Sequence, residues 1–152
     1  MLRKTIIEII TALLIVLFVY ASISKWLDFK EFTRDMHNQP FPGWMATSLI
    51  WVLPPVEILI ALALMFDKTR AIGLWAALVL MSLFTIYAVA ILVGIFNRIP
   101  CGCGGIIRGL TWGQHLFFNL FFLIISAVGI VINKKDQHSN MIAVRLAADA
   151  IQ

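Results

Sequence analysis

The sequence predicts an all-α polytopic membrane protein, a bundle of four transmembrane helices, from three observations. Of its 152 residues, 61% are hydrophobic and only 13% are charged, whereas soluble domains are about half apolar and a quarter charged. Four apolar runs are long enough to cross the hydrocarbon core, which takes about 20 residues of helix. The runs also lack the alternating pattern of a membrane β-barrel. They lie at about 5–24, 45–66, 71–96 and 115–132, in a transmembrane domain over 1–136 that precedes a tail over 137–152.

The first run follows two basic residues, Arg3 and Lys4. Its apolar stretch is longer than the core of a usual signal peptide, so we expect a retained span and not a cleaved leader. Lys25 closes this run. We expect its long side chain to extend to the outer headgroups.

The next segment, residues 25–44, mixes alternating charges with aromatic residues. This spacing suits a short helix in the interface plane that ends before Pro40 and Pro42. The second run contains Pro54 and Pro55. Their missing amide donors predict a kink near the bilayer centre.

Glu57 lies in the second run, where a charge is costly unless it is protonated, paired or directed into a polar cavity. Two interpretations stay open. Glu57 is a proton acceptor for thiol or quinone chemistry, or it is a neutral carboxyl that satisfies backbone groups freed by Pro54 and Pro55.

The third run has no charged residue between Ala71 and Phe96, and the fourth has a recognisable start. Thr111 and Gln114 have the spacing of a capping box, with Thr111 as the N-cap. His115, Asn119 and Ser126 are separated by four and seven positions, so they share one helical face. We expect this polar face to turn inward.

The distribution of Lys and Arg favours both termini in the cytoplasm. With that orientation the inner segments contain seven basic residues, Arg3, Lys4, Lys68, Arg70, Lys134, Lys135 and Arg145. The outer segments contain five, Lys25, Lys30, Arg34, Arg98 and Arg108. The tail is then cytoplasmic. The only two cysteines, Cys101 and Cys103, lie on the extracytoplasmic side, where disulfides form and persist.

The Cys-Gly-Cys pair allows three interpretations. The thiols could be packed as small apolar side chains. They could bind a metal with His115, His37 or Met36, although structural zinc sites usually have four ligands and a wider cysteine spacing. They could cycle between a dithiol and a strained, reducible disulfide, for which Gly102 permits the tight bend.

The predicted surroundings favour the redox interpretation. Arg98, Arg108, a protonated His115 and the amino end of the fourth helix would each favour the thiolate. The basic residues form no dense block with aromatic residues, so we expect no nucleic-acid partner. No metal is assigned to the pair.

Five stretches, "ASISKW", "DFKEF", "PPVEILIAL", "CGCGG" and "LTWGQHLFFNL", occur in this order. With them the chain resembles the MauE family of four-helix membrane proteins, related to DoxX, over about residues 8–130. The resemblance implies a redox-associated protein that supports maturation of methylamine dehydrogenase, a periplasmic enzyme rich in disulfides. It matches Cys101 and Cys103 to the family's paired cysteines, Lys25 to its basic residue after the first helix, and Glu57 to its acidic residue in the second.

These observations together predict an inner-membrane protein that exchanges thiol and disulfide with an exported partner, for which a thioredoxin-like protein is a candidate. Cys101 and Cys103 would carry the electrons, His115 would be the local acid or base, and Glu57 a proton site. No cofactor is certain, and a quinone is a candidate to reoxidise the pair. The alternative is a non-catalytic membrane subunit or assembly scaffold, and a metal-binding chaperone is third.

Overall fold

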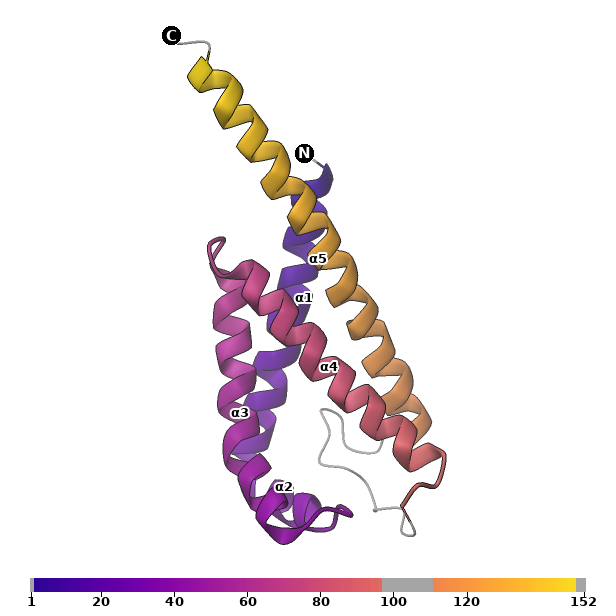
Figure 1. Ribbon diagram of the computed structural model, residues 1–152. Helices are drawn as coiled ribbons and strands as arrows, with labels where there is room; N and C mark the ends of the chain where they lie inside the picture. The colour runs from indigo at the N-terminus through magenta and orange to yellow at the C-terminus, as the bar shows by residue number, and fades with distance from the viewer. Residues whose placement is uncertain (1, 97–110, 150–152) are drawn as a thin grey trace.

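The computed structural model describes residues 2–96 and 111–149, with side chains described for 2–96 and 111–136. This part of the chain is helical and has no strand (Figure 1). Its helices are α1 (Leu2–Leu27), α2 (Phe29–His37), α3 (Gly43–Met65), α4 (Arg70–Leu92) and α5 (Trp112–Asp149). Four segments are long and apolar enough to cross a membrane: α1, α3, α4 and Trp112–Asp136 of α5. The predicted fold class is confirmed.

The third span ends at Leu92, earlier than the predicted residue 96. Gly94 adopts a φ of +71°, a left-handed conformation that glycine takes without a side-chain clash. The amide of Gly94 donates to the carbonyl of Ile91, and the amide of Ile95 donates to that of Ala90, both at 3.1 Å. This is the Schellman pattern that ends helices. Hydropathy alone extends the run past this point because Ile95 and Phe96 are apolar.

The helix α3 continues through Pro54 and Pro55. The kink expected there stays a prediction. The short helix α2 lies in the segment expected to form an interfacial helix, and it ends at His37, before Pro40 and Pro42.

The fourth spanning helix begins as predicted. The side-chain oxygen Oε1 of Gln114 accepts a hydrogen bond from the backbone amide of Thr111 at 2.8 Å. The backbone amide of Gln114 donates in return to the Thr111 hydroxyl at 3.4 Å. This is the reciprocal capping box. The helix then continues to Asp149, so residues 137–149 extend α5. The cytoplasmic location of the tail stays a prediction.

The spanning helices pack as a bundle in which α1 contacts α3 and α5, and α4 contacts the same two helices. Small residues allow the closest approaches, as is usual in membrane helix packing. A side chain at Gly73 would meet Leu64 of α3, and one at Gly129 would meet Leu74 and Ile10. The core includes six large side chains that are almost fully buried: Ile7, Leu14, Phe18, Leu64, Leu74 and Met81.

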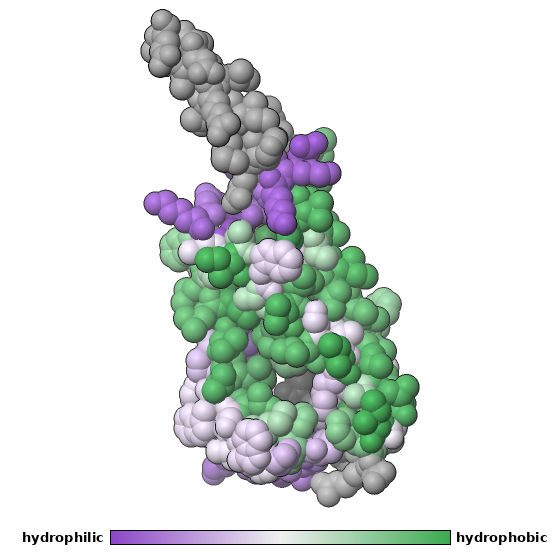
Figure 2. Space-filling view, viewed as in Figure 1, coloured by the Kyte–Doolittle hydropathy of each residue, from purple (hydrophilic) through white to green (hydrophobic). Residues whose placement is uncertain are grey.

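The outside of the bundle is largely apolar (Figure 2). The start of α1 and the turn between α3 and α4 lie at one end of the bundle, and α2 and the start of α5 lie near the other (Figure 1). This arrangement fits a bundle that crosses a bilayer, with α2, the end of α4 and the start of α5 on the same side.

Candidate functional site

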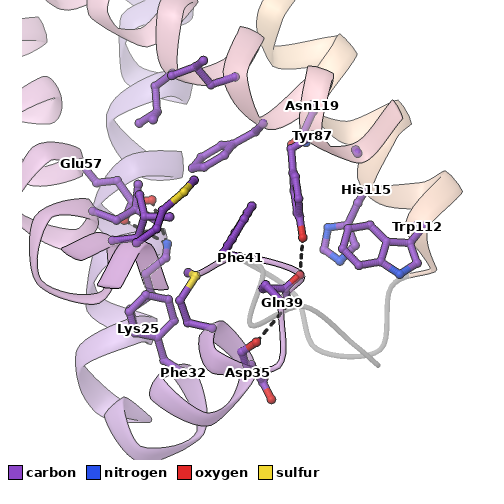
Figure 3. Close-up of a pocket in the computed structure, with 18 of the residues that line it drawn as sticks. Lys25, Phe32, Asp35, Gln39, Phe41, Glu57, Tyr87, Trp112, His115 and Asn119 are labelled. Carbon is purple, nitrogen blue, oxygen red and sulfur yellow. Dashed lines mark hydrogen bonds and ion pairs between the residues drawn. The ribbon is translucent and has the colours of Figure 1, made fainter. Parts of the chain in front are cut away.

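A cavity of about 370 Å³ lies at the end of the bundle next to α2 (Figure 3). All five helices contribute to its wall. Six of its residues are phenylalanine, tyrosine or tryptophan: Phe32, Phe41, Phe84, Tyr87, Trp112 and Phe118. The wall also contains polar groups, and these gather on two sides.

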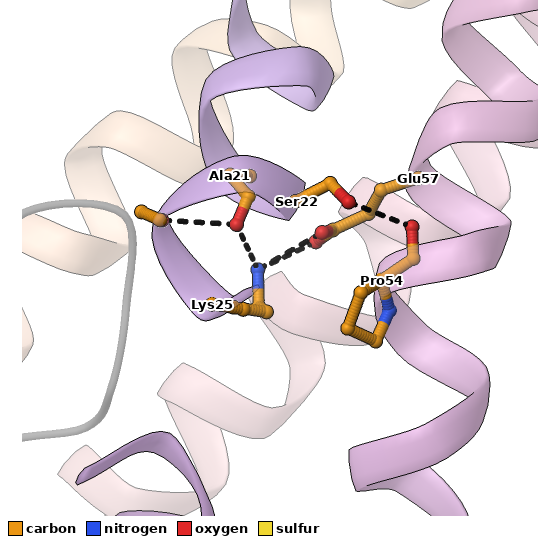
Figure 4. A network of polar contacts seen from close by, with 6 residues as sticks. Ala21, Ser22, Lys25, Pro54 and Glu57 are labelled. Carbon is orange, nitrogen blue, oxygen red and sulfur yellow. Dashed lines mark hydrogen bonds and ion pairs between the residues drawn. The ribbon is translucent and has the colours of Figure 1, made fainter. Parts of the chain in front are cut away.

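One side of the cavity contains a buried ion pair between Lys25 of α1 and Glu57 of α3 (Figure 4). The Lys25 Nζ lies 2.8 Å from Oε1 and 3.0 Å from Oε2 of Glu57. The side chains are only 7% and 1% exposed. The expectation that Lys25 extends to the outer headgroups is therefore wrong, because its ammonium turns inward to a carboxylate.

Further hydrogen bonds support this pair. Lys25 also donates to the carbonyl oxygen of Ala21 at 3.1 Å, and the adjacent Ser22 hydroxyl donates to the carbonyl of Pro54 at 3.0 Å. Burial of an unpaired charge costs several kcal/mol, about 3–5 when one partner of a pair is removed. Here the two opposite charges are neutralised and hydrogen-bonded, and they join α1 to α3.

The facing side of the cavity is formed by His115 and Asn119 of α5 (Figure 3). Both side chains are half-buried. The His115 ring lies 6.1 Å from the Trp112 ring, centroid to centroid. Within the described part of the chain, neither the imidazole of His115 nor the amide of Asn119 makes a hydrogen bond, so both are available to a ligand.

Ser126 shares the polar face of α5 with these two residues but lies outside the cavity wall. It is fully buried, and its hydroxyl donates to the carbonyl of Phe122 at 2.8 Å. The helical period therefore predicted the inward-facing side of α5 correctly, and the structure separates two cavity residues from one that is satisfied within its own helix.

Tyr87 connects the parts of the cavity wall. Its hydroxyl donates to Oε1 of Gln39, whose amide in turn donates to the carbonyl of Asp35 at 3.0 Å (Figure 3). Its ring lies 6.1 Å from the rings of both Phe96 and Trp112. The chain on both sides of residues 97–110 is thereby anchored at the same cavity residue.

Of the predicted site residues, Glu57 and His115 contribute to this one cavity. Cys101 and Cys103 lie outside the described residues, as do Arg98 and Arg108. Among the residues with described side chains, no three of the types His, Cys, Asp and Glu come together in a metal-binding arrangement.

Sequence reasoning missed the partner of Glu57 and the role of Tyr87. A signal for the first was present. Lys25 and Glu57 are opposite charges in or beside apolar spans, and such groups usually pair with each other. Nothing in the sequence indicates that Tyr87 contacts Gln39, which lies 48 positions away.

Comparison with known families identifies a matching family. The family model described as "Methylamine utilisation protein MauE" matches residues 3–132. The searches of curated proteins and of solved structures gave no match. The match covers most of the chain, and the chain therefore belongs to the MauE family, as a membrane protein.

Proposed function

We propose that this MauE-family protein exchanges thiol and disulfide, through Cys101 and Cys103, with an exported protein. The exchange forms or reduces disulfides of that partner. The observation that carries the proposal is the anchoring of both flanks of the Cys-Gly-Cys segment. Phe96 and Trp112 each pack on Tyr87, a wall residue of the cavity. The extended chain spans at most about 3.6 Å per residue, which keeps Cys101 within about 18 Å of Phe96.

The reaction balances as an exchange of sulfur bonds. A thiolate of the partner attacks one sulfur of a Cys101–Cys103 disulfide, and the other cysteine leaves as a thiolate. The second partner thiolate then attacks the mixed disulfide, which releases an oxidised partner and a reduced Cys101–Cys103 pair. The reverse sequence reduces the partner.

We assign His115 as the local acid or base. Its imidazole faces the cavity, and within the described residues it has no hydrogen bond that would fix a proton on one nitrogen. A neutral imidazole can take a proton at one nitrogen and return it, which is what thiolate formation and release require.

Glu57 has a different role in this proposal. Its carboxylate is held by Lys25 at 2.8 Å, so it is first a positioning residue that keeps the ammonium in the cavity wall.

The description of the family, methylamine utilisation, favours a partner in that process. A thioredoxin-like protein is a candidate partner by its chemistry.

A thiol count in intact cells tests the proposal. A membrane-impermeant reagent that adds a fixed mass to each thiol is applied before and after mild reduction. We expect no tags before reduction and two tags after it, because a reducible disulfide faces the outside. The Cys101→Ser and Cys103→Ser variants should each accept one tag without reduction, except in molecules whose remaining cysteine is held in a mixed disulfide with the partner.

Failure to label after reduction would contradict the proposal. The same two single variants provide a second test, since one of them should trap the partner in a mixed disulfide that dithiothreitol releases. If the double variant Cys101→Ser with Cys103→Ser still supports the partner's maturation, the protein acts as an assembly scaffold and the exchange function is excluded.

A further inference from the structure

The cavity is embedded among the spanning helices and opens to the side of the bundle. Leu83 belongs to its wall and is also 57% exposed on the outer face of α4. Figure 2 shows a hollow on the face where α3 and α4 diverge, above α2. The hollow is surrounded largely by apolar residues. Leu83 therefore joins the cavity wall to the apolar outer surface, and we infer that a ligand enters on this side from the lipid phase.

The wall favours a flat molecule. Aromatic side chains from α2, α4, α5 and the connection before α3 face the cavity: Phe32, Phe41, Phe84, Tyr87, Trp112 and Phe118. Such rings stabilise another ring by offset or edge-to-face packing. A volume of about 370 Å³ is at the lower end of the about 300–1,000 Å³ of small-molecule sites. It suits one ring system with a short substituent.

The polar groups favour a neutral molecule with a hydrogen-bond acceptor at the edge that faces α5. On one side, the Lys25 ammonium is already neutralised by Glu57. On the facing side, His115 and Asn119 make no hydrogen bond within the described part of the chain and can each donate one. A carboxylate or phosphate would face Glu57 without an unpaired cation, so an anionic lipid headgroup fits poorly.

We propose that this cavity binds a membrane quinone, with its ring between the aromatic side chains and a carbonyl oxygen towards His115 and Asn119. The redox consequence rests on the proposed function. The Cys101–Cys103 dithiol would lose two electrons and two protons and form the disulfide. The quinone would gain the same two electrons and two protons and become the hydroquinone. The direction is then oxidation of the exported partner.

Binding is measured first on the full chain in neutral lipid nanodiscs, with a short-tailed benzoquinone as the probe. Trp112 is one of five tryptophans and the only one in the cavity wall described here, so a bound quinone should quench its fluorescence. We expect saturable quenching that Trp112→Phe largely removes. Asn119→Leu should raise the dissociation constant by about 3- to 10-fold, the value of one hydrogen bond.

Three further variants keep the test specific. Leu83→Phe narrows the side opening and should weaken binding, whereas Ile86→Phe, at a 65% exposed position on the same helix, should leave it unchanged. Ser126→Ala removes a polar group from the same face of α5 outside the cavity, so binding should again be unchanged. A fold check by circular dichroism accompanies each variant.

The failures of the two proposals can be told apart. In the double variant Cys101→Ser with Cys103→Ser, the quinone should still bind, while hydroquinone formation from a dithiol substrate stops. Binding without any dithiol-dependent hydroquinone in the unaltered protein would leave the site standing and overturn the exchange function. Non-saturable quenching, or equal displacement by a long-chain alcohol that has no ring, would show lipid partitioning and overturn the quinone site.

Discussion

Lys25 and Glu57 show how two charged side chains can be buried together inside a membrane bundle. Each alone would leave a charge at 7% or 1% exposure, away from water. Together they form two contacts at 2.8 and 3.0 Å, and Ala21 supplies one further acceptor. Lys25 also lies in the last turn of α1, where the helix dipole favours a cation.

Removal of one partner should be more damaging than removal of both. Glu57→Gln leaves the ammonium without its counter-charge, and we expect the free energy of unfolding to fall by about 3–5 kcal/mol. The double variant Lys25→Met with Glu57→Leu should lose much less free energy of unfolding than Lys25→Met alone and Glu57→Leu alone lose in sum, because no buried charge remains. Unfolding is measured by titrating a mild detergent with SDS.

Lys30→Met is the control for loss of a positive charge. Lys30 is exposed on α2, and we expect a change within about 0.5 kcal/mol. Additive losses in the double variant would mean that the two side chains contribute independently and that the ion pair does not join α1 to α3.

At the residue scale, the sequence predicted that Glu57 needs special surroundings but not which residue provides them. The cost of a charge in an apolar span meant that Glu57 had to be protonated, paired or directed into a polar cavity. Lys25 lies 32 positions away, and only the packing of α1 on α3 brings the two together. The inward face of α5 was predictable because it depends on helical period alone.

At the element scale, the chain backbone of α3 and α4 comes into close contact at Gly73 and Leu64. A Cβ atom at Gly73 would lie 2.9 Å from the backbone nitrogen of Leu64 and 2.9 Å from its Cγ. Backbone cannot move aside as a flexible side chain does. The spacing of α4 from α3 therefore depends on the absence of a side chain at residue 73.

Gly73→Ala should consequently destabilise the bundle by about 1–3 kcal/mol, the usual cost of overpacking. The matched control is Gly43→Ala at the first residue of α3, where nothing lies within 4 Å of the added atom. Both changes add the same methyl group. The same SDS titration checks both, and equal stability of the two variants would show that α3 and α4 separate freely.

The number and type of helices were predictable because long apolar runs determine them. The ends of the helices were less predictable. Hydropathy extended the third span to residue 96, while local backbone chemistry at Gly94 ends the helix at Leu92. The start of α5 was predictable because a capping box is a local sequence pattern. The cavity was not, since all five helices contribute to it.

At the scale of the whole molecule, the exposed side chains change character along the bundle axis. Apolar side chains cover the middle, and hydrophilic residues gather near the start of α1 and the turn between α3 and α4 (Figure 2). This turn contains Asp67 and Lys68, and Arg70 at the start of α4 pairs with Asp67. The basic residues at this end are those that predict a cytoplasmic location.

This orientation can be tested with single cysteines in a Cys101→Ser, Cys103→Ser background. Asp67→Cys probes the turn between α3 and α4, at a side chain that is 85% exposed, and Asn38→Cys probes the exposed connection after α2. Neither change removes a basic residue, and acidic residues contribute little to orientation. In intact cells, an impermeant thiol reagent should label Asn38→Cys and spare Asp67→Cys, with both labelled after lysis.

The result bears on the chemistry as well as on the topology. The helix α4 is long and apolar enough to cross the membrane, and its carboxyl end lies at the same end of the bundle as α2 (Figure 1), so we expect the segment that follows α4 on the side of Asn38 and not on that of Asp67. Labelling of Asp67→Cys alone would place the Cys-Gly-Cys segment in the reducing cytoplasm, where persistent disulfides are rare. Exchange with an exported partner would then be excluded, whereas the proposed entry of a quinone from the lipid does not depend on the orientation of the bundle.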